Sequence, residues 1–417
     1  MNFIFKESTK IMRYKHKVVL GNLYTGQWIR IPESVYKIFQ MAIDNNLNLS
    51  SLKEFLYDDE DKKYIDEVYK YLFKIDVIHN TNCRKIDKNK IILFELTNRC
   101  NLKCKHCCID SDTSENRFKD LNIKEIKFIL DKIVEWNPEC ITLTGGEPML
   151  RDDFFDILRY LRNKYSKRIC ILTNGTIINS INSKLLVELV DQIDISIDGI
   201  DEESCALVRG KDVFNKVINS IRILQNVGFN SISLSMVFGN KNSHLKQEFV
   251  NLNKKLNTYP IIREFKAVGR GEINKKIFYD KRETESVLDR EFVSGEFRKK
   301  FNISSCSAGK KELYIKHNGD IYPCQAFLDE KYLIDNIMNI KSLHDLKPNS
   351  IKYHEFYKNF ENDISLDNIK CKDCEVNLFC WPCPSEIKPM LENDICFEQT
   401  CKEIKPILFE EIWGETL

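Results

Sequence analysis

The sequence has no excess of charge of one sign and no long apolar run. Its 417 residues include 63 Lys and Arg against 62 Asp and Glu, a formal net charge of +1 at pH 7. This balance argues against a strongly basic nucleic-acid-binding surface and against an acidic tail. No stretch approaches the roughly 18 consecutive apolar residues that indicate a membrane-spanning helix. We therefore predict a protein that binds neither nucleic acid nor a membrane.

A secretory signal is also missing, because Lys and Glu residues interrupt any apolar segment near the start. A cytoplasmic location is the expectation, and disulfides are rare in that reducing compartment. The 16 cysteines therefore need another purpose, and they are unevenly placed: residues 1–82 have none, three lie within 100–107, and eight lie between 306 and 401. This placement predicts metal or cluster ligation at two separate places.

Three regions of the chain are expected to be separate domains. Residues 1–82 combine strand patterns with three helical patterns, which suggests a winged-helix-like module followed by a linker at residues 83–90. Residues 91–285 alternate strand and helix patterns, and six such repeats predict an α/β fold, a partial (β/α)6 barrel of the TIM type. Residues 286–417 lose this periodicity and gain cysteine, so we expect an irregular α+β domain held by metal clusters.

Cys100, Cys104 and Cys107 follow directly after a predicted buried strand at residues 91–96. Three thiolates on such a loop can bind three irons of a four-iron cluster and leave the fourth iron for an external ligand. The alternatives are a zinc loop or cysteines that are merely buried. Because closed structural zinc sites usually take four ligands, the spacing favours the cluster.

The segment Cys-Asn-Leu-Lys-Cys-Lys-His-Cys at residues 100–107 resembles the signature of radical S-adenosylmethionine enzymes. Further motifs of that family follow the next three predicted strands: Thr144–Pro148, Asn174-Gly175, Ser196–Gly199 and then Val208–Gly210. The resemblance implies that S-adenosylmethionine binds at the carboxyl ends of the strands of a partial barrel. It also implies reductive cleavage of that cofactor to a 5′-deoxyadenosyl radical, which abstracts a hydrogen atom from the substrate.

The resemblance assigns contacts with the methionyl part of the cofactor. Glu147 is expected to accept hydrogen bonds from the ammonium group, and Gly145 and Gly146 let the backbone approach the ligand closely. Arg209 suits the methionyl carboxylate, because a guanidinium group pairs well with it. Two glycines alone usually mark a turn, and an arginine alone is more often a surface charge. These roles therefore depend on the motifs occurring together.

The nucleoside part has its own candidates by the same resemblance. Ser196 and Asp198 are candidates for contact with the ribose, and Asn174 is counted among the cofactor-binding residues. His106 stands where many relatives have an aromatic residue, and its backbone is expected to face the adenine. Four other cysteines of the region are expected to be buried small hydrophobic residues: Cys108, Cys140, Cys170 and Cys205.

The later cysteines resemble the SPASM extension of radical S-adenosylmethionine enzymes, which carries two auxiliary 4Fe-4S clusters. With the first triplet this implies three clusters. The resemblance assigns one auxiliary cluster to Cys306, Cys324 and Cys383. It assigns the other to Cys371, Cys374, Cys380 and, as the expected fourth ligand, Cys401, with Cys396 as the alternative. The spacing of two residues before Cys383 and the extra cysteine near the end depart from the usual pattern, and a pair of zinc sites is the alternative.

Residues 1–82 resemble the RiPP recognition element, a small domain that binds the leader of a ribosomally made precursor peptide. The leader is expected to add as a strand to a sheet edge. Segments 306–309 and 322–324 resemble thioether-forming maturases of the sactipeptide and ranthipeptide type, so a cysteine-to-carbon thioether is the expected product. An external flavodoxin-like or ferredoxin-like electron donor is implied.

Other functions remain open from the sequence. Among enzymes, the rivals are carbon–carbon crosslinking, epimerisation and oxidation of the sulfatase-maturing type to formylglycine. A different class is an iron–sulfur redox-sensing or metal-sensing regulator with a DNA-binding winged helix. The motif Gly145-Gly146-Glu147 argues against such a regulator, because a sensor has no need for a methionine-binding motif.

Overall fold

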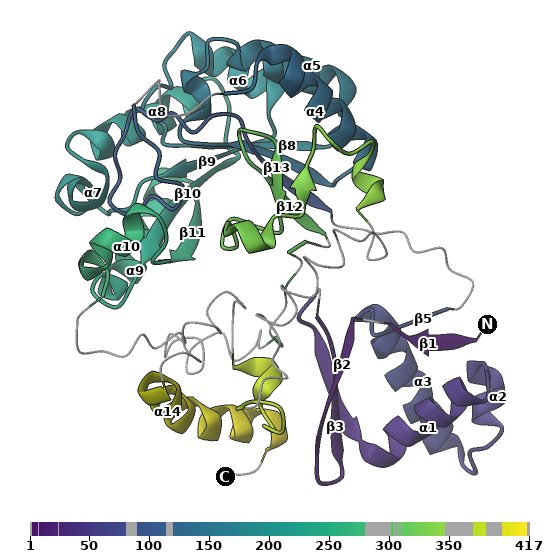
Figure 1. Cartoon of the computed structure of the whole chain (residues 1–417). Coiled ribbons are helices and arrows are strands. Elements are labelled where there is room, and N and C mark those ends of the chain that lie inside the picture. Colours follow the sequence, from purple (N-terminus) through teal and green to yellow (C-terminus); the bar gives the residue numbers. More distant parts are fainter. Residues whose placement is uncertain are drawn as a thin grey trace. The chain divides into compact units, whose positions relative to one another are not determined.

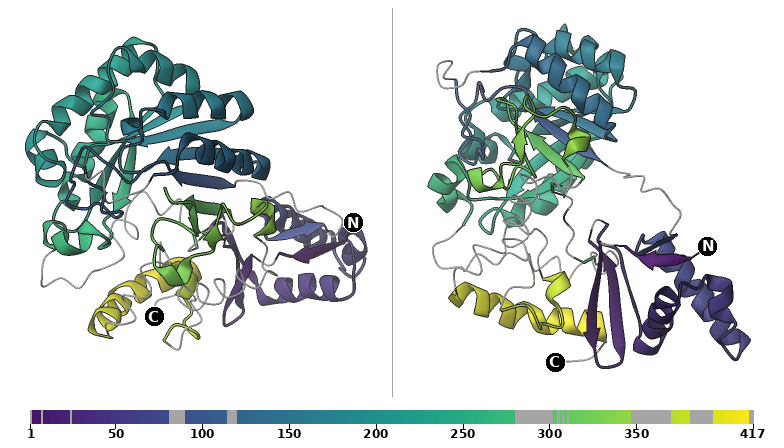
Figure 2. Two further views of the ribbon diagram at one scale, coloured as in Figure 1. Left: turned by 45° about the horizontal axis from the view of Figure 1, so that its top comes forward. Right: turned by 45° about the vertical axis from the view of Figure 1, so that its right-hand side comes forward.

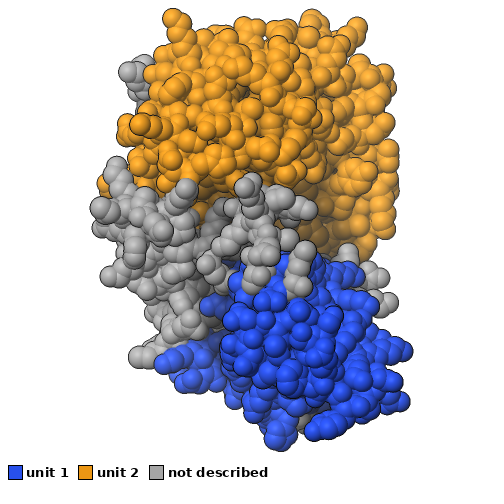
Figure 3. All heavy atoms as spheres, turned by 90° about the vertical axis from the view of Figure 1, so that its right-hand side faces the viewer, with its two compact units in different colours: residues 1–86, 284–307, 360–417 blue, residues 87–283, 308–359 orange. Residues whose placement is uncertain are grey.

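The structure is a computed structural model of the whole chain (Figure 1). It describes residues 2–6, 8–23, 25–80, 90–113, 120–279, 302–303, 306, 308–309, 311–346, 370–380 and 394–414, the side chains of residues 394–396 and 400 excepted. The chain forms two compact units, which are coloured separately in Figure 3: residues 1–86, 284–307 and 360–417, and residues 87–283 and 308–359. No described helix is both long enough and apolar enough to cross a membrane.

The second unit is built on a curved, mostly parallel sheet with helices along one face (Figures 1 and 2). Six consecutive parallel strands are β6 (Ile91–Glu95), β7 (Cys140–Thr144), β8 (Arg168–Thr173), β9 (Gln192–Ser196), β10 (Ile232–Phe238) and β11 (Tyr259–Glu264). The intervening helices are α4 (Ile123–Trp136), α5 (Phe154–Lys164), α6 (Asn182–Leu189), α7 (Glu202–Arg209), α8 (Val213–Asn226), α9 (Lys246–Leu256) and α10 (Arg270–Asn274). This arrangement confirms the predicted α/β repeats and is consistent with a partial barrel of the TIM type.

Helix α4 shows why these repeats were visible in the sequence. Its start is fixed by a capping box, in which the Asn122 side chain accepts from the Glu125 N–H while the Glu125 side chain accepts from the Asn122 N–H. Ile126, Ile129 and Ile133, spaced at helical intervals, are fully buried. A helix with one apolar stripe packs against the sheet and exposes its polar face.

A seventh parallel strand, β12 (Glu312–Ile315), pairs with β6 and extends the sheet beyond the six predicted repeats. The chain then turns at Gly319, which has a φ of +90°, into β13 (Asp320–Tyr322) and on to β14 (Asp335–Asn336). β12 and β13 therefore form a hairpin with Asn318-Gly319 at its turn. Its pairing with the barrel strand was not predicted, because a four-residue strand carries no signal for a distant partner.

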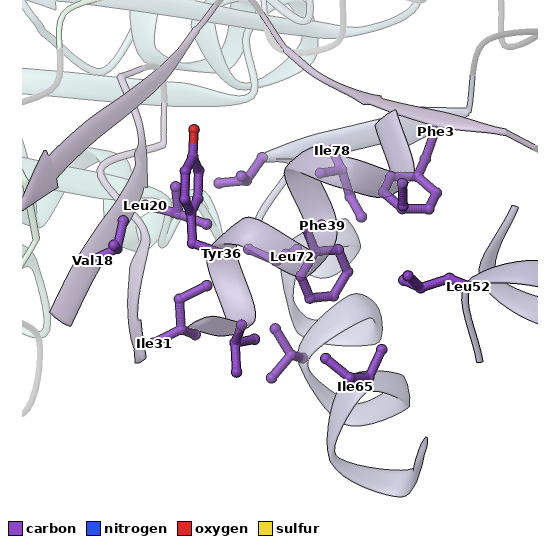
Figure 4. Close-up of a cluster of buried hydrophobic side chains, with 14 of the residues drawn as sticks. Phe3, Val18, Leu20, Ile31, Tyr36, Phe39, Leu52, Ile65, Leu72 and Ile78 are labelled. Atoms are coloured by element: carbon purple, nitrogen blue, oxygen red, sulfur yellow. The ribbon is translucent and has the colours of Figure 1, made fainter. Parts of the chain in front are cut away.

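The first unit begins with an antiparallel sheet in the order β2 (Thr9–Tyr14), β3 (Lys17–Asn22) and β4 (Trp28–Pro32). Three helices follow, α1 (Glu33–Asp44), α2 (Leu49–Lys53) and α3 (Asp59–Lys74), and β1 (Phe3–Phe5) pairs with β5 (Ile78–Asn80). Figure 4 shows Leu20, Phe39 and Leu72, from a strand and two helices, among the side chains that form one apolar core. The three helices agree with the three helical patterns of the sequence, while the winged-helix assignment stays a prediction.

The same sheet contributes to a second core. Val18 and Leu20 of β3 point into the core of Figure 4, whereas Val19 packs with the C-terminal helix α14 (Asp394–Trp413). Because successive strand residues face opposite sides, β3 is buried on both. Residues 360–417 thus belong to the first unit and residues 308–359 to the second, although we expected one C-terminal domain over 286–417. The functional domain boundaries themselves stay a prediction.

Candidate functional site

The loop after β6 brings three thiols together. Cys100 and Cys104 are buried, Cys107 is partly exposed, and the three interact electrostatically with one another. Backbone N–H groups point at two of the sulfurs: Leu102 donates to Cys100 Sγ at 3.4 Å and Ser111 donates to Cys107 Sγ at 3.3 Å. Burial raises the pKa of Cys100 to about 12. Such thiols become thiolates only when a strong positive charge, such as a bound metal, is added.

Arg270, at the start of α10, holds this loop in shape. Its Nε donates to the carbonyl of Cys104 at 3.0 Å, its Nη1 to Asp110 at 2.7 Å, and its Nη2 to the carbonyl of Ser111. Together with Arg209 it places positive charge near the thiol of Cys104. The sequence analysis missed Arg270, because one arginine after an edge strand has no pattern that sets it apart from a surface residue.

Glu147 is completely buried at the carboxyl end of β7. Its carboxylate accepts hydrogen bonds from Thr173 Oγ1 at 2.9 Å, from the Asn174 N–H at 2.8 Å and from the Met149 N–H at 3.2 Å. Burial nevertheless raises the pKa of Glu147 to about 7. A buried carboxylate of this kind is stabilised by an incoming cation, so its chemistry fits the ammonium group expected there.

The two glycines before Glu147 allow the backbone to pack against the cysteine loop. A Cβ on Gly145 would lie 2.3 Å from the Thr97 carbonyl oxygen, and one on Gly146 would lie 2.2 Å from the Arg99 carbonyl oxygen. Gly145 also has a φ of +150°. In this structure glycine is therefore required at these two positions by the close approach of the protein's own backbone. The close approach of a ligand, which the sequence predicted, would be a second reason for glycine.

Asn174 connects the β8 loop to the cysteine loop. Its Nδ2 donates to Asn101 Oδ1 at 2.8 Å and lies 3.8 Å from Cys100 Sγ. Because the Asn174 N–H also donates to Glu147, this residue spans the two predicted binding elements. Carboxyl ends of neighbouring parallel strands meet at one edge of a sheet, which is why motifs far apart in the sequence converge here.

Asp198, after β9, is approached by an arginine and a histidine side chain. Arg209 donates to Asp198 Oδ2 from both Nε and Nη2 at 2.6 Å, and His106 Nε2 lies 2.9 Å from the same oxygen. Burial opposes ionisation of Asp198, but the charges of Arg209 and His106 outweigh it and lower the pKa of this carboxyl. Arg209, predicted to pair with a ligand carboxylate, therefore has a carboxylate partner within the protein. Its Nη1 also lies 3.7 Å from Cys104 Sγ.

The remaining predicted contacts lie at the same edge. Ser196 Oγ is 3.3 Å from Ser235 Oγ on β10. His106 Nδ1 is buried without a hydrogen-bond partner in the described part of the chain, and its ring centroid is 6.0 Å from that of Phe278. An orphaned buried nitrogen beside three thiols fits a pocket that a ligand would complete. Among the four other cysteines that were expected to be buried, Cys170 and Cys205 are buried, whereas Cys108 and Cys140 are partly exposed.

In the first unit, four of the later cysteines gather at one place. Cys374 and Cys371 are joined by a backbone hydrogen bond of 3.1 Å, and the thiols of Cys371, Cys374 and Cys401 all act on Cys380. Burial, followed by these neighbours, raises the pKa of Cys380 well above its ordinary value. Cys401 on α14 thus lies near Cys371, Cys374 and Cys380, the three cysteines with which the sequence resemblance grouped it. This donor set fits a thiolate-bound cluster.

The other predicted set is not assembled by the described residues. Cys306 belongs to the first unit and Cys324 to the second. Cys383 and the side chain of Cys396 lie outside the described residues. In the described ranges, no group of three or more His, Cys, Asp or Glu side chains is arranged around a single metal-ion position.

Comparison with known protein families agrees with the two cysteine regions. Residues 94–252 match the radical SAM superfamily, and residues 306–375 match the iron–sulfur cluster-binding domain SPASM. The mycofactocin maturase MftC of Mycolicibacterium smegmatis is 27% identical over 277 residues, which are 61% of this chain and 69% of that protein. A probable GTP 3′,8-cyclase of Saccharolobus islandicus is 28% identical over 206 residues, 49% of this chain. The chain spans 66% of the length of that cyclase, just under two thirds.

Solved structures with the same fold include two that hold a ligand relevant to this arrangement. Streptococcus suis SuiB bound to precursor peptide SuiA superposes with a TM-score of 0.56 and 16% identity, over 94% of this chain and 97% of that chain. Native anSMEcpe with bound AdoMet superposes with a TM-score of 0.54 and 18% identity, over 78% of this chain and 97% of that chain. At these identities the likeness establishes the fold, and it confirms the predicted α/β architecture of the barrel.

Proposed function

We propose that this chain, which contains a radical S-adenosylmethionine domain followed by a SPASM domain, is an enzyme that modifies a ribosomally made precursor peptide. S-adenosylmethionine and iron–sulfur clusters are the cofactors of these two domains. The observation that carries the proposal is the convergence of the Cys100 loop, Glu147 and Asn174 at one edge of the parallel sheet. MftC, a maturase, and SuiB, solved with a precursor peptide, support a peptide as the substrate.

The residues of the second unit would bind and orient these cofactors. Cys100, Cys104 and Cys107 would hold one cluster, and Arg209 and Arg270 would stabilise the negative charge of its thiolates. Glu147 would hold the methionyl ammonium, and the buried surroundings would exclude water. When bound, the reduced cluster and S-adenosylmethionine together supply a 5′-deoxyadenosyl radical that can take a hydrogen atom from an unactivated carbon.

Arg209 has a role in this proposal that differs from the one expected from sequence. Its Nε and Nη2 are used by Asp198, so only Nη1 and the second hydrogen of Nη2 could serve a ligand carboxylate. The pair would instead position His106 and the Cys104 thiolate beside the nucleoside. Ser196, at the end of β9, is the candidate for the ribose.

The auxiliary clusters are proposed at the later cysteines. Cys371, Cys374, Cys380 and Cys401 would bind one of them, which is supported by the mutual approach of their thiols. Cys306, Cys324 and Cys383 would bind the other, with Cys396 as a possible fourth ligand. The chain would then carry three clusters and receive electrons from a flavodoxin-like or ferredoxin-like donor.

The first unit is proposed to bind the leader of the precursor. Its sheet has the order β2-β3-β4, so β2 and β4 are the outer strands of that sheet in the described residues. An extended peptide could add to one of them by main-chain hydrogen bonds. The second unit would then act on the part of the peptide that follows the leader.

Thioether formation is the proposed reaction, because segments 306–309 and 322–324 resemble thioether-forming maturases. The test is to search the neighbouring genes for a short cysteine-containing open reading frame, to co-express the enzyme with the peptide that it encodes, and to measure the mass of the purified peptide. A peptide lighter by two hydrogen atoms, with one fewer thiol that reacts with iodoacetamide, is the expected product. The same mass change with every thiol retained would instead indicate carbon–carbon crosslinking. An unmodified peptide, with no 5′-deoxyadenosine formed, would contradict the enzymatic function.

A further inference from the structure

Three arginines lie at the carboxyl edge of the parallel sheet, and two of them are used by the protein itself. Arg209 is paired with Asp198, and Arg270 donates to the cysteine loop. Arg263, on β11, is partly buried, and in the part of the chain that the structure describes it makes no hydrogen bond and no ion pair. Its charge acts on the thiol of Cys108. A guanidinium group near the cysteine loop therefore keeps its N–H donors for a ligand or for water.

The strand register shows which face of the sheet Arg263 occupies. Ser196 of β9 lies opposite Ser235 of β10, with 3.3 Å between their hydroxyl oxygens, and Ser235 lies opposite Ile261 of β11. Residues that are opposite each other on parallel strands share a face, and so do residues two apart along one strand. Arg263 therefore lies on the face of Ser196, the candidate for the ribose, and nearer than Ile261 to the carboxyl end of its strand.

This face of the sheet points away from the helices (Figure 1). Ile195 is on the opposite face, where it lies beside Gly175 together with Val217 of α8. Closed barrels of the TIM type fill their interior mainly with Val, Ile and Leu. The face of Ser196 instead carries polar side chains on β7, β9 and β10, which include Thr142, Gln192, Asp194 and Ser233. Such a surface suits a polar ligand better than a packed core.

The segment that follows Arg263 packs against the cysteine loop. Phe265 stacks on Phe278 with 4.3 Å between the ring centroids, and the ring centroid of Phe278 is 6.0 Å from that of His106. A Cβ on Gly269 would lie 2.6 Å from the carbonyl oxygen of Cys108. The end of β11 is therefore held beside the residues that are proposed to bind the cluster and S-adenosylmethionine.

The methionyl carboxylate is the competing ligand for Arg263, and the geometry disfavours it. The Glu147 carboxylate, proposed to hold the methionyl ammonium, accepts hydrogen bonds from Thr173 and Asn174 at the end of β8. In the sheet order β11-β10-β9-β8, strands about 4.8 Å apart put β11 about 14 Å from β8 along the sheet. The ammonium and the carboxylate of methionine share one carbon atom, so both groups lie near β8 and away from Arg263.

We propose that Arg263 binds a carboxylate of the precursor peptide and thereby selects which peptide enters the cofactor site. The inference rests on the proposed function. A guanidinium group forms two parallel hydrogen bonds with a carboxylate, which gives the contact both strength and direction. The part of the peptide that is modified therefore carries an Asp or Glu side chain, or the C-terminal carboxylate, close to the reacting carbon. Because this contact is made before and during the reaction alike, it lowers the KM for the peptide and leaves kcat largely unchanged.

The assay uses the holoenzyme with the peptide found by the search of neighbouring genes. We expect Arg263→Gln to raise the KM for the peptide at least about tenfold, as for the loss of charge-assisted hydrogen bonds, with little change in kcat. Peptides in which each Asp or Glu is replaced in turn by Asn or Gln, and one with a C-terminal amide, identify the carboxylate. Its removal should raise KM in the unsubstituted enzyme and have no further effect in Arg263→Gln. An unchanged KM, or effects that add for every carboxylate, would overturn the proposal.

Two comparisons separate peptide binding from a role at the cofactors. Arg222→Gln changes an exposed arginine of α8 and should leave the KM for the peptide unchanged. The iron content of Arg263→Gln and its affinity for S-adenosylmethionine should match those of Arg222→Gln. A clear loss of iron or of S-adenosylmethionine affinity in Arg263→Gln alone would show that Arg263 serves the cluster or the methionyl carboxylate, and would overturn the proposal.

A second measurement needs no precursor peptide. Phenylglyoxal modifies accessible guanidinium groups, and mass spectrometry of the digested holoenzyme locates the label. We expect label on Arg263 and Arg222, and little on Arg209, which is buried in its pair with Asp198. An excess of N-acetylglutamate should protect Arg263 and leave Arg222 reactive, whereas N-acetylglutamine should protect neither.

The labelling also keeps the two proposals distinguishable. Equal protection of Arg263 and Arg222 by N-acetylglutamate, or protection of neither, would contradict a carboxylate site at Arg263. If the unsubstituted enzyme modifies no peptide, the proposed function fails, and the labelling alone decides whether Arg263 binds a carboxylate.

Discussion

Arg209 and Asp198 form a buried ion pair in which two guanidinium nitrogens lie 2.6 Å from one carboxylate oxygen. His106 approaches the same oxygen, and Arg209 also reaches toward the sulfur of Cys104. The pair therefore links the end of β9 to the cysteine loop after β6. Its position makes it a support of the cysteine loop.

The Asp198→Asn substitution should be strongly destabilising. It removes the negative charge and leaves the buried Arg209 uncompensated, and breaking such a pair costs about 3–5 kcal/mol of unfolding free energy. Denaturant unfolding of the purified protein measures this cost. Asp156→Asn, which breaks the exposed pair with Arg159, is the matched control and should cost less than about 1 kcal/mol. Similar costs for the two variants would contradict the structural role of Asp198.

S-adenosylmethionine should bind more tightly as the pH rises through neutrality. The pKa of buried Glu147 is raised from 4.5 to about 7, so without ligand the folded state holds a proton there that the unfolded state has lost. The free energy of unfolding that Glu147 contributes therefore falls progressively as the pH rises from about 4.5 to 7. The ammonium group of the ligand offsets this loss. We expect the ligand-induced increase in Tm to be larger at pH 8 than at pH 6. In Glu147→Gln the pH dependence should vanish, and an unchanged dependence would exclude Glu147 as its source.

Replacing Cys100, Cys104 and Cys107 together by Ala should abolish 5′-deoxyadenosine formation. The later cysteines lie elsewhere in the chain, so the purified protein should stay brown and keep most of its iron. Iron analysis and chromatography of the reaction products check both statements. Undiminished 5′-deoxyadenosine from the triple variant would refute the assignment of this loop.

Arg270→Met should lower the iron content of the first cluster without affecting the later cysteines. The substitution removes hydrogen bonds to Cys104, Asp110 and Ser111, which fix the loop that carries the thiols. We expect 5′-deoxyadenosine formation to fall about tenfold or more, since loss of residues that support metal ligands typically costs that much. Arg159→Met, on an exposed helix surface, is the control and should behave like the unsubstituted protein.

Cys401→Ala should lose one auxiliary cluster, whereas Cys396→Ala should keep it. The thiol of Cys401 acts on both Cys374 and Cys380, which places it in that ligand set. Iron per chain and the visible absorption of anaerobically purified variants distinguish the two outcomes. Retention of all iron in Cys401→Ala would show that the fourth ligand comes from elsewhere.

Much of the barrel could be predicted because its signals are local. The apolar stripe of α4 and the strand-ending motifs at Glu147 and Asp198 each occupy a few consecutive positions. The last of the six strands, β11 (Tyr259–Glu264), gives a weaker signal, since an exposed edge strand lacks a continuous apolar run. The sequence did not predict the Arg209–Asp198 pair, because only the folded chain shows which polar side chains face each other.

The division of the C-terminal third could not be read from the sequence. β12 joins β6 across more than two hundred residues, and α14 packs against Val19 and Trp28 of the first sheet. Such contacts depend on three-dimensional complementarity, which neither helical nor strand periodicity encodes. The contacts of Tyr314 and His317 with the buried Glu95 carboxylate were missed for the same reason, since they exist only once β12 lies beside β6.

Deleting residues 1–82 is consequently a poor test of leader binding. The deletion would expose Phe409 and Trp413 of α14. It would also remove Trp28, which packs edge-to-face on Phe379 with 5.0 Å between the ring centroids. Phe379 lies in the loop that carries Cys374 and Cys380. We expect the truncated protein to lose iron from that site. Surface substitutions on β2, such as Lys10→Glu, would test leader affinity and leave this core intact.

Segments that are far apart in the sequence, residues 12–28 and 376–413, complete one apolar core, and this has a consequence for biosynthesis. Met12, Val19 and Trp28 are synthesised long before the helix that covers them, in which Trp413 donates to the Glu375 carbonyl at 2.8 Å. Domains usually fold in order as they are synthesised, the N-terminal one first. Here one face of the first sheet must stay uncovered until α14 has been synthesised. The cysteine site around Cys374 and Cys401 can therefore be completed only after α14 has been synthesised.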